Sequence, residues 1–436
     1  MAMIRPETEM KDSGVQWLGI IPKEWSVGKV KHEFYATKTI VGDKVNDYER
    51  LALTLNGVIK RSKDAGDGLQ PEKFDGYQIL KEHELVFKLI DLANVSTSRV
   101  GLSPYTGIVS PAYIVLHHRK DMNPRYGEYY FLSMWMNEVF NHIGGDGVRS
   151  ALNAKDLLNI PYLKVSPDEQ RAIADYLDKT CSQIDYIIAE AKASIDEYKE
   201  LRQGVIFEAV TKGLDKNVEM KSTSVGWIGT VPSHWRLTKI RQVAEFYNGD
   251  RSSKYPSGDD IVSEGIIFIT SNNLGYIVLN TNISTNKFIT KQKYDDLGGA
   301  KLRKNDIVFC LRGSVGKCAI NKAFDEGTIA SSLVVIRAKK VDADYLNYVL
   351  QNHRITDEAI VNAIGIGSLN LAAHDISEFY MPIPPEKEMQ DIVRYLNDKI
   401  GNVDYLIAEK ESLINDLEAY KKSLIYEVVT GKRRVV

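Results

Sequence analysis

The chain has 436 residues, of which 44% are hydrophobic and 26% are charged, and its formal net charge is −2. This length allows several domains, and the ordinary apolar fraction excludes a wholly disordered chain. No apolar run approaches the ~18 residues of a membrane span, the first residues lack the apolar core of a signal peptide, and three cysteines are too few for a disulfide framework, so we expect a cytoplasmic protein without a membrane partner. The near-zero charge argues against a polycation that coats nucleic acid, but not against a local basic face.

Two tryptophan motifs indicate that the chain is internally duplicated. Residues 10–25 and 220–235 share the pattern Trp-x-Gly-x-x-Pro-x-x-Trp at an offset of 210 residues. A second repeat has an offset of 219 residues and relates residues 169–177 to residues 388–396. Because the offsets differ, the additional length of the second copy lies between its tryptophan motif and its helical segment. We expect the duplication to produce an internal pseudo-twofold relation.

Two segments carry an apolar seam whose spacing alternates between four and three residues, from residue 184 to 210 and again 219 residues later. This spacing is typical of coiled coils. It predicts two long helices that pair with each other, although each helix could instead cover only its own domain. The predicted pairing residues are Ile184, Ile188, Ile195, Tyr198, Val205, Val403, Ile407, Ile414, Leu417 and Leu424. Arg202 and Lys421 share one seam position, so we expect these like charges to lie near a helix end or to be offset from each other in an antiparallel pair.

Short β-rich runs separated by turn clusters precede each helical segment. The predicted fold is therefore mixed α+β, with two similar α/β domains separated by two long helices that form an antiparallel coiled coil. The predicted boundaries are residues 1–160 for the first domain, 161–217 for the first helical spacer, 218–381 for the second domain and 382–436 for the second spacer.

Basic side chains gather beside glycine and serine in both domains. Arginine and lysine together with serine on loops are the residue types that contact DNA phosphates and base edges, although solvated loops of this composition are equally common. The candidate DNA-binding residues are Lys60, Arg61, Lys63, Ser96, Ser98, Arg99, Arg251, Ser252, Ser253, Lys254, Arg312, Ser314 and Lys317. The two domains carry weak positive charge and the helical segments weak negative charge, which is the direction expected of basic readers on acidic spacers.

A catalytic signature is missing from the sequence. The run from Arg312 to Cys318 resembles a phosphate loop only superficially, because a Walker A motif needs glycine where the chain has Leu311 and Ser or Thr where it has Cys318. The histidines and cysteines lack the spacing of a metal site. We therefore predict no catalytic residues and no metal ligands, and we favour a binding or assembly protein.

Two tryptophan motifs, two variable domains and two matching helical segments, in this order, closely resemble the specificity subunit of Type I restriction–modification systems. The resemblance covers essentially the whole chain, although the proline-rich lead-in of the first helix is reduced to Pro161 and Pro167. It implies that each domain is a target recognition domain reading one half of a split sequence on double-stranded DNA. It also implies that the helices form a spacer and dock two modification (methyltransferase) subunits, which restriction (translocase/nuclease) subunits then join.

The resemblance further implies that this chain carries no cofactor, and that S-adenosylmethionine, ATP and Mg²⁺ belong to the partner subunits. A spacer spanning residues 184–210 would be about 40 Å long, close to one DNA turn of ~34–36 Å. The main alternative is a non-catalytic scaffold whose coiled coil joins proteins and whose domains bind ligands other than nucleic acid. An enzyme with an unrecognised site is a third interpretation.

Overall fold

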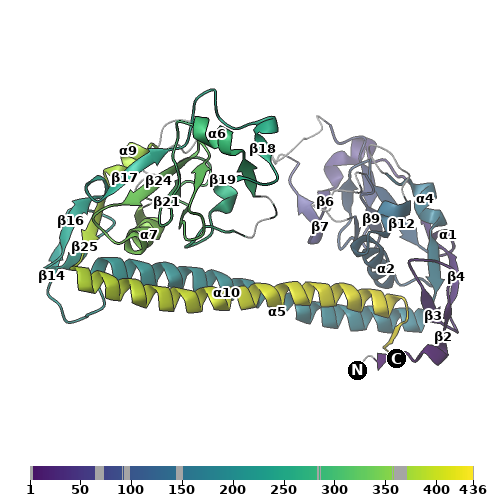
Figure 1. Cartoon of the computed structure of the whole chain (residues 1–436). Coiled ribbons are helices and arrows are strands. Elements are labelled where there is room, and N and C mark those ends of the chain that lie inside the picture. Colours follow the sequence, from purple (N-terminus) through teal and green to yellow (C-terminus); the bar gives the residue numbers. More distant parts are fainter. Residues whose placement is uncertain are drawn as a thin grey trace. The chain divides into compact units, whose positions relative to one another are not determined.

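A computed structural model describes residues 3–63, 73–90, 92, 99–143, 151–281, 284, 286–355, 357 and 371–435 of the chain. The chain divides into two compact units: unit 1 comprises Met1–Ala191 with Glu411–Val436, and unit 2 comprises Lys192–Lys410. Each unit therefore contains one α/β domain, the first part of the helix that follows this domain, and the last part of the other long helix (Figure 1). Ser96 and Ser98 lie outside the described residues.

The two long helices are α5 (Pro167–Lys212), with 46 residues, and α10 (Glu386–Val429), with 44 residues. Helix α5 is longer than its seam predicts, because its first turns bury Ile173 and Leu177 in unit 1 before the seam begins. Pro167 occupies the first helical position, where a missing N–H is harmless. In the described ranges, neither these helices nor any shorter helix has the length and apolarity needed to cross a membrane.

A glycine with left-handed backbone lies just past the end of each helix. Gly213 has φ 75° and Gly431 has φ 72°, a conformation that favours glycine and terminates helices. In each unit the two helices run antiparallel, because an early residue of one helix pairs with a late residue of the other. Figure 1 shows the two helices side by side.

The domain of unit 1 contains two four-stranded sheets, with strand orders β10-β9-β12-β5 and β7-β6-β11-β8. Helix α2 packs on the first sheet, where Phe131 contacts Phe34 and Phe87 edge to face. The opposite face of this sheet packs against the second sheet through Val86 and Val115. The elements are β5 (Phe34–Ala36), β6 (Arg50–Thr54), β7 (Gly57–Arg61), β8 (Gln78–Leu80), β9 (Leu85–Phe87), β10 (Val100–Leu102), β11 (Gly107–Val109), β12 (Ile114–His118), α2 (Pro124–Met136), α3 (Val139–Ile143) and α4 (Ala154–Asn159).

Shorter elements connect this domain to the helices. Strand β4 (Ser26–Lys29) pairs with β13 (Pro161–Lys164) immediately before α5, and α1 (Val30–Glu33) follows β4. The tryptophan motif forms a hairpin from β2 (Met10–Asp12) and β3 (Ile20–Pro22). The two ends of the chain meet in unit 1, where β1 (Met3–Ile4) pairs with β26 (Arg433–Arg434).

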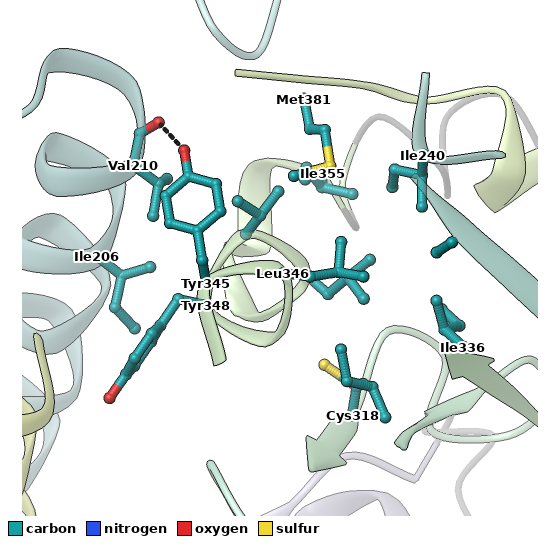
Figure 2. Close-up of a cluster of buried hydrophobic side chains, with 14 of the residues drawn as sticks. Ile206, Val210, Ile240, Cys318, Ile336, Tyr345, Leu346, Tyr348, Ile355 and Met381 are labelled. Carbon is teal, nitrogen blue, oxygen red and sulfur yellow. Dashed lines mark hydrogen bonds between the residues drawn. The ribbon is translucent and has the colours of Figure 1, made fainter. Parts of the chain in front are cut away.

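Unit 2 repeats this plan with the sheets β17-β24-β21-β22 and β18-β20-β19-β23. Helix α7 joins the first sheet and the long helices in one core, in which Leu346 and Tyr348 lie near Ile206 and Ile336 (Figure 2). The elements are β14 (Met220–Ser222), β15 (Thr230–Pro232), β16 (Arg236–Lys239), β17 (Ala244–Asn248), β18 (Ile261–Val262), β19 (Ile266–Ile269), β20 (Lys287–Ile289), α6 (Lys291–Asp296), β21 (Ile307–Cys310), β22 (Cys318–Ile320), β23 (Gly327–Ile329), β24 (Leu333–Ala338), α7 (Ala343–Gln351), α9 (Ala373–Ser377) and β25 (Tyr380–Ile383).

The first sheets of the two domains have the same strand order, whereas the second sheets differ. Both second sheets contain one parallel pair, β6 with β11 and β19 with β23. In unit 1 the next neighbour of β6 is β7, which follows directly in a hairpin. In unit 2 the corresponding neighbour of β19 is β20, which follows after a longer connection. The two copies therefore share a scaffold and diverge in the second sheet.

Candidate nucleic-acid interface and docking helices

Each tryptophan motif holds the beginning of the long helix in its own unit. The indole Nε1 of Trp25 donates to Glu169 Oε2 at 2.9 Å, and that of Trp235 donates to Glu388 Oε2 at 2.8 Å. Both indoles are buried. A buried indole N–H needs an acceptor, so this duplicated bond fixes the direction in which each helix leaves its domain.

The same motifs also contact the end of the other helix in their unit. A Cβ added at Gly431 would lie 2.9 Å from Trp25 Cη2, and one added at Gly213 would lie 3.1 Å from Trp235 Cζ2. These close approaches explain why glycine follows both helices. Each unit thus has one anchor point where a helix begins and another helix ends.

A tyrosine from each domain strengthens this anchor. The hydroxyl of Tyr126 on α2 donates to the carbonyl of Val429 at 3.3 Å. The hydroxyl of Tyr345 on α7 donates to the carbonyl of Val210, also at 3.3 Å, as Figure 2 shows. Burial raises the pKa of both hydroxyls well above their usual range, so they remain neutral donors. The domains are therefore tied to both long helices by matching bonds.

Two ion pairs cross the helix seam at equivalent positions. Lys421 Nζ lies 2.6 Å from Asp185 Oδ1 in unit 1, and Arg202 Nη1 lies 2.5 Å from Asp404 Oδ1 in unit 2. The expectation that antiparallel order separates Arg202 from Lys421 is confirmed, since each cation faces an aspartate. Among the ten predicted pairing residues, Tyr198, Val205 and Leu417 are half-buried and the other seven are buried.

The outer faces of the helices carry a repeated apolar pair. Tyr186 is 65% exposed and is followed by Ile187 in unit 1; the equivalent Tyr405 is 64% exposed and is followed by Leu406 in unit 2. Large apolar side chains repeated on a helix face outside the seam mark an interaction surface. The arrangement provides one such surface in each unit.

In unit 2 the predicted basic residues lie on two loops at the same end of the first sheet. Residues 251–254 follow β17, and residues 312–317 join β21 to β22. Strand register pairs Asn248 with Val334 and Cys310 with Leu333, so both loops leave the sheet beside the start of β24. The candidate residues on both loops are exposed.

Each of these loops has its own internal support. Asp250 Oδ1 accepts from the backbone N–H of Ser252 at 2.6 Å, while Oδ2 accepts from Gly298 at 2.8 Å. A side-chain hydrogen bond from Ser252, together with these backbone bonds, lowers the pKa of Asp250, which lines an open cleft of about 650 Å³. Gly313 and Gly316 both have positive φ within the other loop, which closes a β-hairpin and is not a phosphate loop.

In unit 1 the candidate residues differ from one another in their bonding partners and in their exposure. Lys60 forms an ion pair with Glu49 at 2.5 Å, and Lys63 Nζ donates to the carbonyl of Val45 at 2.6 Å. Arg61 lies at the end of β7, directly opposite Arg50. Arg99 requires a correction: it is only 1% exposed, and its guanidinium is turned inward to the carbonyl of Leu92 at 3.3 Å. Its burial removes it from the DNA-contacting candidates.

Both domains contain a carboxylate–cation pair that is absent from the residues predicted from the sequence. Glu84 lies 2.6 Å from His117 Nδ1 in unit 1, and Asp306 lies 2.7 Å from Arg337 Nε in unit 2. The partners are more than thirty residues apart and meet only through strand register. The parallel between residues 84–87 and 306–309 was the available signal for the acidic members.

Each of these pairs lies beside an exposed tyrosine. His117 stacks on Tyr35 with ring centroids 5.0 Å apart, and the Arg337 guanidinium lies 4.7 Å from the Tyr247 ring. The hydrogen bond to Glu84 raises the pKa of His117 despite burial. Among the described residues, no group of three or more His, Cys, Asp or Glu side chains is arranged to hold a metal ion.

Comparison with known proteins relates this architecture to one family. A family model described as the Type I restriction modification DNA specificity domain matches residues 232–417. The Type I restriction enzyme MjaVIII specificity subunit of Methanocaldococcus jannaschii is 24% identical over 316 residues, which cover 70% of each chain. The MjaX specificity subunit from the same organism is 23% identical over 443 residues, covering 96% of each chain.

A solved structure supports the fold. A chain from work on complex assembly and conformational transition of the type I R-M system superposes with a TM-score of 0.67 at 13% identity, covering 94% of this chain and 99% of that chain. These matches do not favour a scaffold that binds ligands other than nucleic acid. The chain is similar to the specificity subunits of Type I restriction–modification systems, over 96% of its length in the case of MjaX.

Proposed function

We propose that this chain reads a bipartite DNA sequence, with one half-site assigned to each target recognition domain. The observation that supports this proposal is that the two domains are attached to the helices in the same way but differ in their exposed surfaces. Both domains attach to the long helices through the same Trp–Glu and Tyr–carbonyl bonds, whereas their second sheets and basic loops differ. Two domains that share their attachment but differ in their exposed surfaces are suited to bind two different half-sites.

We further propose that the exposed helix faces dock two modification subunits. Tyr186 with Ile187, and Tyr405 with Leu406, repeat the same surface once per unit. A duplicated surface binds two copies of one partner most simply. Restriction subunits would then join the complex through the modification subunits or beside them.

Catalysis belongs to the partners in this proposal. Modification would use S-adenosylmethionine, cleavage would use ATP and Mg²⁺, and this chain would supply the sequence choice without a cofactor of its own. The three cysteines support this division of labour, because all are buried. Burial raises the pKa of Cys181 to about 11, which makes it a poor nucleophile.

Exchange of a recognition domain tests the reading function. Residues 236–381 would be replaced by the corresponding domain of a related subunit, and the methylated sequence would be mapped for the complex with its modification subunits. We expect one half-site to change and the other to remain. A change in both half-sites, or in neither, would contradict the assignment of one half-site per domain.

Paired substitutions test the docking function. We expect Tyr186→Ser with Ile187→Ser to lower the number of modification subunits from two to one, and Tyr405→Ser with Leu406→Ser to do the same. The four changes together should leave none bound. Native mass spectrometry of the purified complex measures this number, and full occupancy in the fourfold variant would reject this surface as the docking site.

A further inference from the structure

The hairpin β6–β7 presents a two-stranded ribbon at the edge of the second sheet in unit 1. Strand β7 is the edge strand, and a two-residue turn joins it to β6. Leu53 and Val58 face each other across the ribbon and are buried. Because side chains alternate along a strand, the opposite face presents another set. This outer face consists of Arg50, Ala52, Thr54, Gly57, Ile59 and Arg61.

Two arginines meet at one end of this outer face. Arg50 and Arg61 are direct cross-strand partners, although like charges in this position repel each other. The Arg50 guanidinium also lies 5.4 Å from the centre of the Phe74 ring. Two cross-strand arginines and the Phe74 ring therefore lie at this end of the ribbon.

The second domain lacks this pair. Its corresponding strands β19 and β20 join Ile266 with Ile289, Ile267 with Phe288, and Phe268 with Lys287. None of these cross-strand pairs contains two cations. The arginine pair thus lies in the part of the fold where the two domains diverge, not among the anchors that they share. Domains that read different half-sites must differ where they touch bases, so this location favours sequence choice over assembly.

The chemistry of the face matches base recognition. A two-stranded ribbon fits the major groove of DNA, and an arginine fork can bond to O6 and N7 of guanine together. Small apolar groups such as those of Ala52 and Thr54 can contact the methyl group of thymine. We propose that the outer face of β6–β7 enters the major groove of the first half-site, with Arg50 and Arg61 as specificity-determining residues. This inference rests on the proposed DNA-reading function.

Charge-preserving variants test this assignment. Arg50→Lys and Arg61→Lys keep the cation but lose the fork. Methylation by the complex with its modification subunits would be measured on duplexes carrying each single base change in either half-site. We expect discrimination at one or two base pairs of the first half-site to fall roughly 5- to 150-fold. The second half-site should keep its profile, and affinity for unrelated DNA should stay within about twofold.

Arg119→Lys is the matched control, because Arg119 is an exposed arginine of the same domain that directly follows β12 of the other sheet. It should keep the wild-type profile, and thermal unfolding should show all three variants folded. Unchanged discrimination in both Arg50→Lys and Arg61→Lys would overturn the inference, as would an equal loss on every sequence. A wild-type complex that methylates without sequence preference would instead remove the proposed function itself.

Discussion

The two units satisfy the same carboxylate with different donors. In unit 1 the second oxygen of Glu169 accepts from Arg5 at 3.1 Å, whereas in unit 2 the second oxygen of Glu388 bonds to His234 at 2.8 Å. The Arg5 side chain is 5% exposed and comes from the segment before the tryptophan motif. The Trp–Glu bond is present in both units. The second oxygen of each glutamate accepts from a different side chain, which comes from a different part of the chain in each unit.

This contrast separates two kinds of constraint. Positions that hold a helix to a domain are alike in both units, because the same antiparallel pair must enter and leave each domain. Positions around these bonds are free to differ in charge, burial and titration. Variants at equivalent positions of the two units can therefore measure whether equivalent contacts contribute equal free energies.

The helix-terminal glycines should give the largest difference. Alanine at Gly431 would place Cβ in overlap with Pro22 Cγ and 2.6 Å from Pro22 Cδ, whereas the closest atom at Gly213 is 3.1 Å away on Trp235. Left-handed backbone costs alanine about 1–2 kcal/mol at either site, and the clash with the rigid proline ring adds about 1–3 kcal/mol at Gly431. We expect Gly431→Ala to lower the free energy of unfolding by about 2–5 kcal/mol and Gly213→Ala by about 1–2 kcal/mol.

Denaturant unfolding of each variant, with hydrogen exchange to locate the loss, checks this order. The loss of protection should centre on unit 1 for Gly431→Ala and on unit 2 for Gly213→Ala. Equal costs at the two glycines would show that the Pro22 contact relaxes freely.

The seam cations should give a smaller difference. Arg202 has a side chain 11% exposed, and its guanidinium also lies 3.1 Å from the centre of the Tyr276 ring. Lys421 is 24% exposed and pairs with a mostly exposed aspartate. We expect Arg202→Ala to cost about 1–3 kcal/mol, which allows for the partial exposure of Asp404, and Lys421→Ala about 0.2–1 kcal/mol.

A double-mutant cycle isolates each ion pair. The coupling energy between Arg202 and Asp404 should be larger than the coupling energy between Lys421 and Asp185. Similar coupling energies in the two cycles would mean that Tyr276 and the deeper burial of Arg202 add nothing measurable.

Most of the architecture could be predicted from the sequence, and the features that could not be predicted have a physical cause. The repeated tryptophans and the seam predicted the duplication and the antiparallel pair, because rare residues and heptad spacing are local signals. Helix α5 lies within the predicted spacer of residues 161–217 and begins before the seam, because Ile173 and Leu177 pack on a domain. Arg99 and the pair of Glu84 with His117 were misjudged or missed, because burial and strand register join residues that are distant in the sequence.

The smallest difference concerns the titration of the two carboxylate–cation pairs. A hydrogen bond to Glu84 raises the pKa of His117 above its usual 6.5, whereas Arg337 stays charged throughout the accessible range. Burial disfavours the charged form of Glu84, but the bond from His117 and the backbone N–H of Lys81 still lower its pKa. The histidine contribution to stability is therefore complete below pH 6.5 and is lost as pH rises through the raised pKa.

The glutamate contribution has the opposite sign. It is present above pH 4.5 and is lost as pH falls through the lowered pKa of Glu84. The pair in unit 1 should thus stabilise most between these limits, and hydrogen-exchange protection of β9 and β12 should decline above pH 6.5 relative to β21 and β24. His117→Gln should abolish the decline, because glutamine bonds without titrating. An equal decline in both units would show that the two pairs respond alike to pH. A decline that persists in His117→Gln would show that another group governs the pH response.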